Sequence, residues 1–271
     1  MTFSGQAPFS VIIPDRPLQG AVVLMHGLNM KPACMLDLAS VWLDAGYAVV
    51  LGVLRGHGEQ SPDSEWAAVT MQDWLEDMAA CRREAGRLAA GKPVWLCGFS
   101  LGAACGFAEY IVTIENTPRL PGSLPPYAGM ILFSPAIRLR PWAHAVRLLF
   151  RWPRVRLSSL AGVRYRVHDH TSIAAYRALF GLRACIKARL VWWRRTRGEA
   201  VLPPLLIVYD PKDVLTAGRT FGRWLPRKHA PLYHRVRANN PWHHLITDRR
   251  ALGEAAWQEL TALIRGMLNP G

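Results

Sequence analysis

Short apolar runs alternate along this chain with longer segments of helical periodicity. The apolar runs cover residues 21–25, 47–53, 94–97, 130–133, 205–209 and 232–236. Segments 33–45, 70–90, 101–114 and 249–267 have apolar residues at helical spacing and no proline. Strands that alternate with helices are typical of a mostly parallel sheet with helices on both faces. The pattern therefore predicts an α/β fold.

One long segment interrupts the alternation. No convincing buried strand lies between the fourth and fifth runs, and residues 137–200 contain 15 Lys and Arg against two acids. Their net charge of +13 accounts for nearly all of the chain's +14. We therefore expect a core made of residues 1–136 and 201–271 and a basic insertion at 137–200. The proline-rich stretch at 117–126 is expected to be a loop.

The composition fits a globular protein. The chain has 271 residues, of which 51% are hydrophobic and 19% charged, and this excludes a disordered chain, a coiled coil and collagen. The five cysteines include no CxxC pair, so we expect buried free thiols. Residues 1–9 lack the basic start and apolar core of a signal peptide. We expect a cytoplasmic protein, free or resting on a membrane surface.

The run at 94–97 leads directly into Gly98-Phe99-Ser100-Leu101-Gly102 and then into a helical run of small residues. A sharp turn from strand into helix needs residues without bulky side chains around an exposed serine. The glycine spacing alone is weak evidence, and the strand-turn-helix context is what strengthens it. Ser100 is therefore the candidate nucleophile.

His26-Gly27-Leu28 directly follows the run at 21–25. A chain leaving the end of a core strand would aim the Leu28 N–H into a cleft. Together with the Leu101 N–H at a helix start, it would form a two-donor oxyanion hole.

The candidate acid and the candidate base each have a competitor. Asp213 lies four residues beyond the run at 205–209, and Asp210 stands at the end of that run. We favour Asp213, because Asp210 stands just before a proline, where an aspartate ordinarily caps a turn. His243 and His244 both follow the last run, and we favour His244, with His243 pointing to the other side if the stretch is extended. The order serine, aspartate, histidine is that of a nucleophile elbow with its acid and base on later loops.

With these residues the chain resembles the α/β-hydrolase superfamily, and within it the monoacylglycerol lipase and carboxylesterase group. The resemblance covers most of the chain outside 137–200. It rests on HGL at 26–28, RGHGEQS at 55–61, TMQDWLEDM at 70–78, GFSLG at 98–102, DPKDVL at 210–215 and HLITD at 244–248. It implies a central, mostly parallel sheet and a helical lid inserted after the sixth strand, which is where residues 137–200 fall.

The resemblance also implies a mechanism. His244 would take the Ser100 proton as the serine attacks an acyl carbonyl, and Asp213 would orient the imidazole. Water would complete the turnover through an acyl-enzyme, with no metal or organic cofactor. The expected function is cleavage of carboxylic esters of lipid-like acyl chains, such as monoacylglycerols. The alternatives are a thioesterase whose basic lid holds a phosphorylated carrier, and a non-catalytic binding module with the hydrolase fold.

Two departures from the family pattern concern the surroundings of the site. The strand before Arg55 lacks the aspartate that many relatives carry two residues ahead of it, which leaves the partner of Arg55 open. The turn before Asp213 lacks the glycine that relatives often have, so Asp210 remains an alternative candidate for the acid. We interpret Asp73 and Asp77 as structural acids that complement a helix dipole, and His57 as a structural loop histidine.

The basic insertion has three interpretations. Projected at 100° per residue, 141–152 places Trp142, Ala145, Val146, Leu149 and Phe150 on one face, with arginines opposite and only Leu148 out of place. Such a helix suits an anionic membrane surface, and the basic aromatic stretch at 187–197 adds to it. A plain lid packed on the core explains the same pattern. Arginines beside an acyl-transfer site would also suit a coenzyme A thioester or an acidic carrier.

Metal, nucleotide and nucleic-acid partners have little support. His168-Asp169-His170 has the composition of a metal cluster, but no distant fourth ligand accompanies it, so we expect a polar loop. No GxxxxGK(S/T) motif is present, and the glycines around Ser100 do not match GxGxxG, so nothing supports a nucleotide cofactor. No recognised nucleic-acid motif accompanies the arginines. A small acyl ester is the expected partner.

Overall fold

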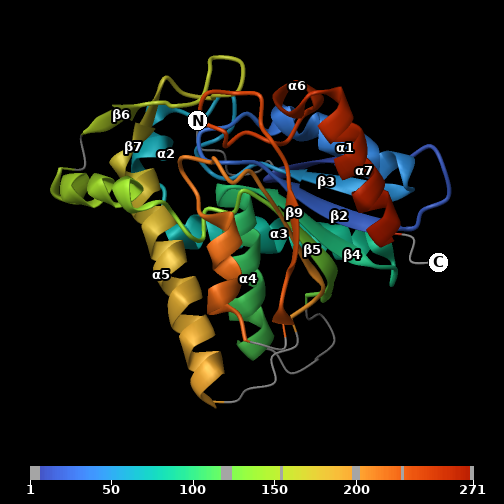
Figure 1. Ribbon diagram of the computed structural model, residues 1–271. Coiled ribbons are helices and arrows are strands. Elements are labelled where there is room, and N and C mark those ends of the chain that lie inside the picture. The colour runs from blue at the N-terminus through green and yellow to red at the C-terminus, as the bar shows by residue number, and fades with distance from the viewer. Residues whose placement is uncertain (1–6, 117–123, 153–154, 197–201, 227–228, 269–271) are drawn as a thin grey trace.

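The computed structural model describes residues 7–116, 124–152, 155–196, 202–226 and 229–268 (Figure 1). A seven-stranded sheet in the order β1-β3-β2-β4-β5-β8-β9 forms its centre. The strands are β1 (Phe9–Ile12), β2 (Gly20–Met25), β3 (Tyr47–Gly52), β4 (Val94–Phe99), β5 (Tyr127–Phe133), β8 (Leu205–Tyr209) and β9 (Leu232–Arg235). β1 is antiparallel to β3, and the other pairs of this sheet are parallel.

All six predicted runs are strands of this sheet. Five of them, β2, β3, β4, β5 and β8, read as continuous apolar runs because most of their residues are buried on both faces, as in other parallel sheets. β9 is an edge strand and is mostly exposed. β1 was not predicted, since it is a short edge strand with two exposed residues. The α/β prediction is therefore confirmed.

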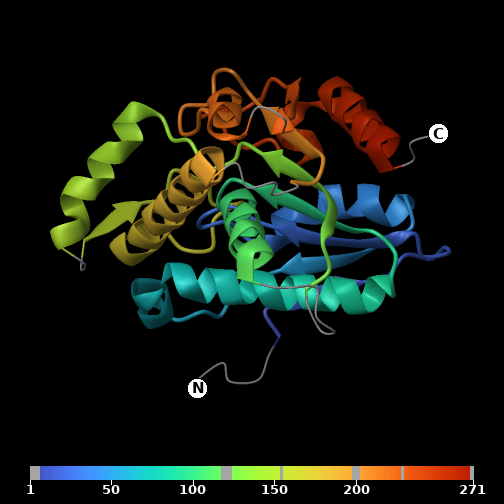
Figure 2. The same cartoon turned by 90° about the horizontal axis from the view of Figure 1, so that it is seen from below.

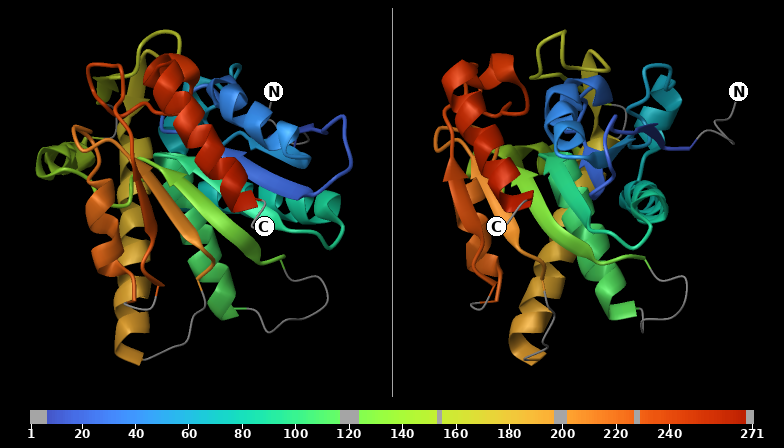
Figure 3. Two further views of the ribbon diagram at one scale, coloured as in Figure 1. Left: turned by 45° about the vertical axis from the view of Figure 1, so that its right-hand side comes forward. Right: turned by 90° about the vertical axis from the view of Figure 1, so that its right-hand side faces the viewer.

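Helices cover both faces of the sheet (Figures 2 and 3). On one face α1 (Leu36–Asp44) and α7 (Glu254–Leu268) pack against the sheet in one hydrophobic cluster. On the other face α3 (Met71–Ala89), α4 (Leu101–Asn116) and α5 (Ile173–Thr196) share a second cluster. Figure 3 shows α7, in red, on the opposite side of the strands from α3, in teal. The sheet is thus the middle of three layers.

The helix predicted at 249–267 is two helices, α6 (Arg249–Leu252) and α7. Gly253 separates them with a φ of +80°, which glycine adopts readily and which does not continue a right-handed helix. The helix predicted at 33–45 begins as a 3-10 turn, η1 (Pro32–Met35), and continues as α1. The helices predicted at 70–90 and 101–114 are α3 and α4. Thr70 and Asp73 form a capping box at the start of α3, each side chain bonding the other's backbone N–H.

The segment between β5 and β8 follows the fifth strand of the described sheet, not the sixth as expected. It contains η2 (Pro141–Arg151), α5, and a short antiparallel pair, β6 (Arg156–Ser158) with β7 (His170–Ser172). In Figure 1 η2 projects from one side of the molecule. α5 packs into the core through Leu182, Ile186 and Leu190, so this half of the segment belongs to the hydrophobic core. The division into a core and a lid at 137–200 stays a prediction. Most of the loop predicted at 117–126 lies outside the described residues.

The single apolar face predicted for 141–152 is wrong, because η2 is a 3-10 helix with three residues per turn. Residues three apart are therefore in line, and Ala143, Val146 and Leu149 form one half-buried row. Trp142, expected on the apolar face, is 54% exposed, and its indole N–H donates to Val214 O at 2.7 Å.

Candidate active site

Ser100 occupies the turn between β4 and α4 with a φ of +49°, a strained conformation for a residue other than glycine. Its own N–H donates to Phe133 O at 2.8 Å, which fixes the turn to the neighbouring strand. The two flanking glycines are required by space. A Cβ on Gly98 would lie 2.7 Å from the backbone of Ala103, and one on Gly102 would lie 2.5 Å from His26 O. The GFSLG sequence is thus what this sharp turn demands.

The structure brings together the three side chains that the sequence favoured. His244 Nε2 lies 2.9 Å from Ser100 Oγ, and His244 Nδ1 lies 2.8 Å from Asp213 Oδ2. The imidazole also packs against Phe99, with ring centroids 5.0 Å apart. Both distances are within hydrogen-bond range for a nucleophile, its base and the residue that orients the base.

Asp213 is buried and accepts several hydrogen bonds. Besides the His244 ring, its carboxylate accepts the N–H groups of Leu215 and Thr216 and the Thr216 hydroxyl, at 2.6 to 2.9 Å. Burial alone would raise the pKa of this carboxyl, but the charge and hydrogen bond of His244 and the bonds from Thr216 outweigh it and leave the pKa below its ordinary value. Asp213 is therefore held in its charged form.

The competing candidates, Asp210 and His243, do not join this group. They pair with each other instead, with His243 Nδ1 3.0 Å from Asp210 Oδ2. The stretch around His243 is a turn, and the φ of this residue is +50°, so the expectation of an extended stretch with alternating side chains does not hold.

Buried histidines hold the loop that follows β2. Burial lowers the pKa of His26 to about 4, so the ring is neutral at pH 7. Its Nδ1 lies 2.8 Å from Gly27 O, and its Nε2 accepts the Leu54 N–H at 3.2 Å. Burial also lowers the pKa of His57, whose Nε2 accepts the Asn29 N–H at 3.0 Å. These bonds flank Leu28, whose N–H the sequence nominated as an oxyanion donor.

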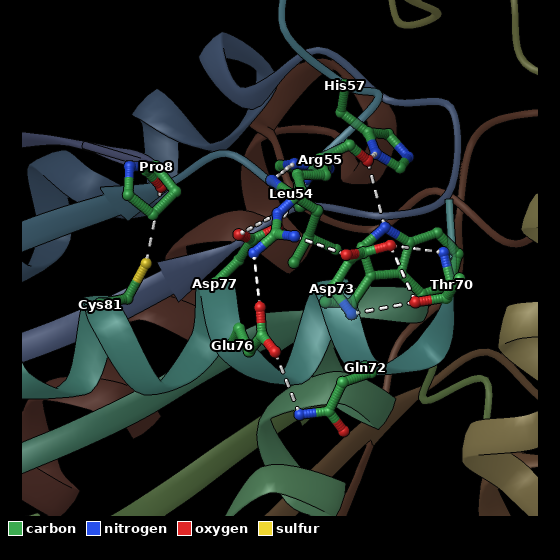
Figure 4. A network of polar contacts seen from close by, with 12 residues as sticks. Pro8, Leu54, Arg55, His57, Thr70, Gln72, Asp73, Glu76, Asp77 and Cys81 are labelled. Atoms are coloured by element: carbon green, nitrogen blue, oxygen red, sulfur yellow. Dashed lines mark hydrogen bonds and ion pairs between the residues drawn. The ribbon is translucent and has the colours of Figure 1, made fainter. Parts of the chain in front are cut away.

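Arg55 precedes His57 in the same loop, and its partners, which the sequence left open, are acids on α3 (Figure 4). The guanidinium pairs with Asp73, with Glu76 at 2.9 Å and with Asp77 at 3.1 Å. Asp77 also accepts the Arg55 N–H at 2.8 Å. Asp73 and Asp77 are thus structural, as expected, but they act as partners of Arg55 in addition to lying in the first turns of a helix.

Ser100 and His244 face a cavity of about 440 Å³. Its walls are mainly aliphatic and aromatic, and many come from the segment between β5 and β8, including Leu139, Leu160, Tyr165, Tyr176, Leu179 and Phe180. Leu28 also lines it. The size falls within the roughly 300 to 1,000 Å³ of small-molecule sites. An apolar ligand would be buried beside the serine hydroxyl.

The start of the segment between β5 and β8 is hydrogen-bonded to the turn that carries Asp213. Arg140 donates to Asp213 O and to Pro211 O, both at 2.9 Å. The Trp142 bond to Val214 reinforces the same contact. Sequence reasoning missed Arg140, because it binds backbone carbonyls about 70 residues away, and no local pattern shows that. Thr216 was also missed, although an acceptor three residues before a threonine is a local turn signal.

A later part of the segment is tied to the loop after β2. The Asn29 side chain accepts the His168 N–H and donates to His168 O, both at 2.8 Å. Lys31 N–H donates to Tyr165 O at 2.8 Å. The segment therefore contacts both the loop after β2 and the turn of Asp213.

The three residues His168, Asp169 and His170 do not gather around one point. His168 stacks on Trp66 with ring centroids 5.3 Å apart, while Asp169 turns outward to pair with Arg166 at 2.6 Å. Among the residues that the structure describes, no group of three or more His, Cys, Asp or Glu is placed to hold a metal ion. The five cysteines are free, and Cys81, Cys97 and Cys105 are buried.

Comparison with known proteins places this geometry in a family. The family described as "Serine aminopeptidase, S33" matches residues 16–193. A thermostable monoacylglycerol lipase of Bacillus sp. (strain H-257) is 28% identical over 204 residues, which cover 73% of this chain and 72% of that protein.

Two solved structures share the fold. A soluble variant of monoglyceride lipase from Saccharomyces cerevisiae has a TM-score of 0.73 at 16% identity, over 97% of this chain and 91% of that one. The monoacylglycerol lipase of Paleococcus ferrophilus has a TM-score of 0.68 at 19% identity, over 96% of this chain and 98% of that one.

The fold and the family resemblance expected from the motifs are thereby confirmed. The family match extends over well more than half of the chain and includes the elbow of Ser100. The chain belongs to the serine hydrolase family described as "Serine aminopeptidase, S33", and it is an enzyme of the lipase and esterase type with the α/β-hydrolase fold.

Proposed function

We propose that this enzyme cleaves carboxylic esters of lipid-like acyl chains, with Ser100 as nucleophile, His244 as base and Asp213 as the acid that orients it. The observation that carries the proposal is the continuous hydrogen-bonded series from Asp213 through His244 to Ser100 Oγ at the edge of an apolar cavity. Nucleophile, base and orienting acid in this order are the requirements of acyl transfer by a serine.

Acylation begins when His244 Nε2 accepts the hydroxyl proton of Ser100 as Oγ attacks the ester carbonyl. Asp213 accepts the Nδ1–H, keeps the ring in this tautomer and stabilises the imidazolium that forms. The imidazolium then gives its proton to the leaving alkoxide. In the second half a water molecule loses a proton to His244 as it attacks the acyl carbonyl. The His244 imidazolium then returns this proton to Ser100 Oγ as the serine leaves and the carboxylic acid is released.

The negative charge that develops on the carbonyl oxygen would be met by the N–H groups of Leu28 and Leu101. Leu101 is the first residue of α4, so its N–H has no partner within the helix and lies at the positive end of the helix dipole. Leu28 lines the cavity in a loop fixed by His26 and His57. Each such donor stabilises a transition state by about 3 kcal/mol in serine hydrolases.

The substrate follows from the cavity and the relatives. An apolar cavity suits an acyl chain, and the proteins named above are monoacylglycerol lipases, so a monoacylglycerol is the first substrate to test. A thioester substrate and a non-catalytic module, the two alternatives from the sequence, are not favoured by these relatives.

The test is release of fatty acid from monoacylglycerols by the wild type and by Ser100→Ala, with acyl-coenzyme A in parallel. We expect turnover of the glyceride that the variant lacks. Equal rates for the two proteins would contradict the proposal. Faster turnover of acyl-coenzyme A, falling steeply with salt, would favour the thioesterase instead.

We also propose that an anionic membrane surface is a partner of the segment between β5 and β8. Seven of the thirteen large hydrophobic side chains exposed in the described chain belong to this segment, Leu148 being 75% and Trp152 56% exposed. Exposed arginines such as Arg147 and Arg151 lie among them. Exposed apolar side chains and arginines on the same segment suit the headgroup region of an anionic bilayer. In the described chain no helix has the length and apolar character to cross a membrane.

Sedimentation with phosphatidylserine vesicles tests this contact. We expect binding that weakens with salt and falls in Leu148→Ser/Trp152→Ser. Leu232→Ser is the matched control, because Leu232 is 62% exposed but lies on β9. Equal binding by both variants would contradict the assignment to this segment.

A further inference from the structure

Asp210 and His243 form a second aspartate–histidine pair beside the first. Both histidines use Nδ1, at 3.0 Å from Asp210 and 2.8 Å from Asp213. The two aspartates share one turn, in which the Asp213 N–H donates to Asp210 O at 3.0 Å. His243 and His244 are consecutive, so two adjacent rings bind two carboxylates of a single turn.

The Asp210 carboxylate joins three parts of the chain. It accepts the Lys212 N–H at 2.8 Å from its own turn, the Ala238 N–H at 2.7 Å from the chain after β9, and the His243 ring. Only 3% of the residue is exposed. Hydrogen bonds to a buried carboxylate are stronger than those between neutral groups. Asp210 therefore fixes the exit of β8 to the loop that carries both histidines.

The backbone of His243 makes the arrangement geometrically feasible. In an extended stretch, neighbouring side chains point to opposite faces. The φ of +50° at His243 departs from that alternation and allows both rings to reach the same turn. Histidine is among the residues enriched at this left-handed conformation.

His243 does not contact the cavity. Among the described residues that line it are Trp242, His244 and Leu245, but not His243. The His243 side chain is 28% exposed, and its Nδ1 is directed to Asp210. Any influence on the reaction therefore passes through the positions of its neighbour His244 and of Asp213, whose N–H binds Asp210 O.

We propose that Asp210 and His243 are positioning residues, a pair that keeps the His244 imidazole between Asp213 and Ser100. This inference rests on the proposed function of the three residues it positions. His244 reaches Asp213 and Ser100 at 2.8 and 2.9 Å, and a displacement of about 1 Å in such a site costs on the order of 100-fold in rate. Loss of the pair should lower kcat by about tenfold or more and leave KM nearly unchanged.

Two substitutions at His243 separate the hydrogen bond from the backbone conformation. His243→Gly keeps the left-handed φ and removes the donor. His243→Asn also tolerates this φ and places an amide N–H near the position of Nδ1. We expect His243→Gly to lower kcat on a p-nitrophenyl ester about tenfold and to slow labelling by a fluorophosphonate. His243→Asn should recover most of both.

A double-mutant cycle tests the pair itself. If the two residues act together, Asp210→Asn/His243→Gly should be no slower than the slower single variant. Additive losses would overturn the proposal, and so would equal losses in the Gly and Asn variants at position 243. If His243→Gly fails to fold, His243→Gln replaces it, because its amide lies one bond too far to reproduce Nδ1.

Ser100→Ala, measured in the same assays, distinguishes failure of the proposed function from failure of the positioning pair. Full activity in Ser100→Ala would refute the proposed function. An inactive Ser100→Ala together with a His243→Gly whose kcat stays within twofold of wild type would refute the positioning pair alone.

Discussion

Gly102 is where the start of α4 comes closest to the end of β2. A Cβ at this position would lie 2.5 Å from the carbonyl oxygens of both Met25 and His26, and real Cβ atoms essentially never approach within 3.0 Å. Both obstacles are backbone atoms, and His26 O already accepts the Gly102 N–H at 3.0 Å. No side-chain rotation can relieve the clash, so Gly102→Ala must push α4 away from β2.

The expected loss of stability is the difference between two effects. Overpacking of this kind costs about 3 kcal/mol, the upper end of its usual range, because backbone has to move. Alanine stabilises a helix by about 1 kcal/mol relative to glycine, which offsets part of this cost. The net loss of about 2 kcal/mol corresponds to a fall in Tm of about 4 to 8 °C for a protein near this size. Since the Leu101 N–H moves with α4, we also expect kcat to fall at least tenfold.

Gly266→Ala is the matched control. It makes the same substitution in α7, where a Cβ would meet nothing within 4 Å, so we expect a gain of up to about 1 kcal/mol and unchanged activity. Urea unfolding followed by tryptophan fluorescence, with kcat on a p-nitrophenyl ester, measures both. If Gly102→Ala were as stable as Gly266→Ala and as active as the wild type, the reasoning from close approach would be refuted.

Three further outcomes are expected. His26 stays neutral in the folded protein down to about pH 4 but is protonated near pH 6.5 in the unfolded chain, so stability should fall by about 3 kcal/mol as the pH drops through that window. Urea midpoints of wild type and His26→Asn should show a shallower pH dependence in the variant, and parallel curves would contradict this. Arg82 and Glu109 form a buried ion pair at 3.1 Å, so Arg82→Met should lower the free energy of unfolding by about 3 to 5 kcal/mol, because it leaves a buried charge without its partner. The double variant Arg82→Met/Glu109→Met should recover part of this loss. An unchanged urea midpoint in Arg82→Met would argue against the prediction. Asp213→Asn should reduce kcat by about four orders of magnitude with little change in the thermal midpoint, because the amide favours the wrong tautomer of His244. A loss of kcat below tenfold would be inconsistent with an orienting carboxylate.

The strands and the elbow could be predicted because local sequence specifies them. The runs of β2, β3 and β4 are apolar on both faces, a pattern that only a covered parallel sheet satisfies. Gly98 and Gly102 flank Ser100 where no Cβ fits, so the turn is visible in the sequence. The order of the later loops then indicated which aspartate and histidine to consider.

What escaped prediction depends on contacts between distant segments. Arg140 and Asn29 act on backbone groups more than 70 residues away, and nothing in their neighbourhood reveals those partners. η2 could not be told from an α-helix, because the two differ by a small change in residues per turn. The pairing of Asp210 with His243 required the fold of both loops, since the sequence offered each only as a competitor of its neighbour.

The central claim is that Ser100 is a nucleophile activated by His244. The most direct measurement is mass spectrometry of the intact protein, and of its peptides, after reaction with a fluorophosphonate. The account predicts a single adduct on Ser100 that forms quickly in the wild type, slowly in His244→Ala and not at all in Ser100→Ala. No adduct on Ser100 in the folded wild type, or equal labelling in His244→Ala, would contradict it.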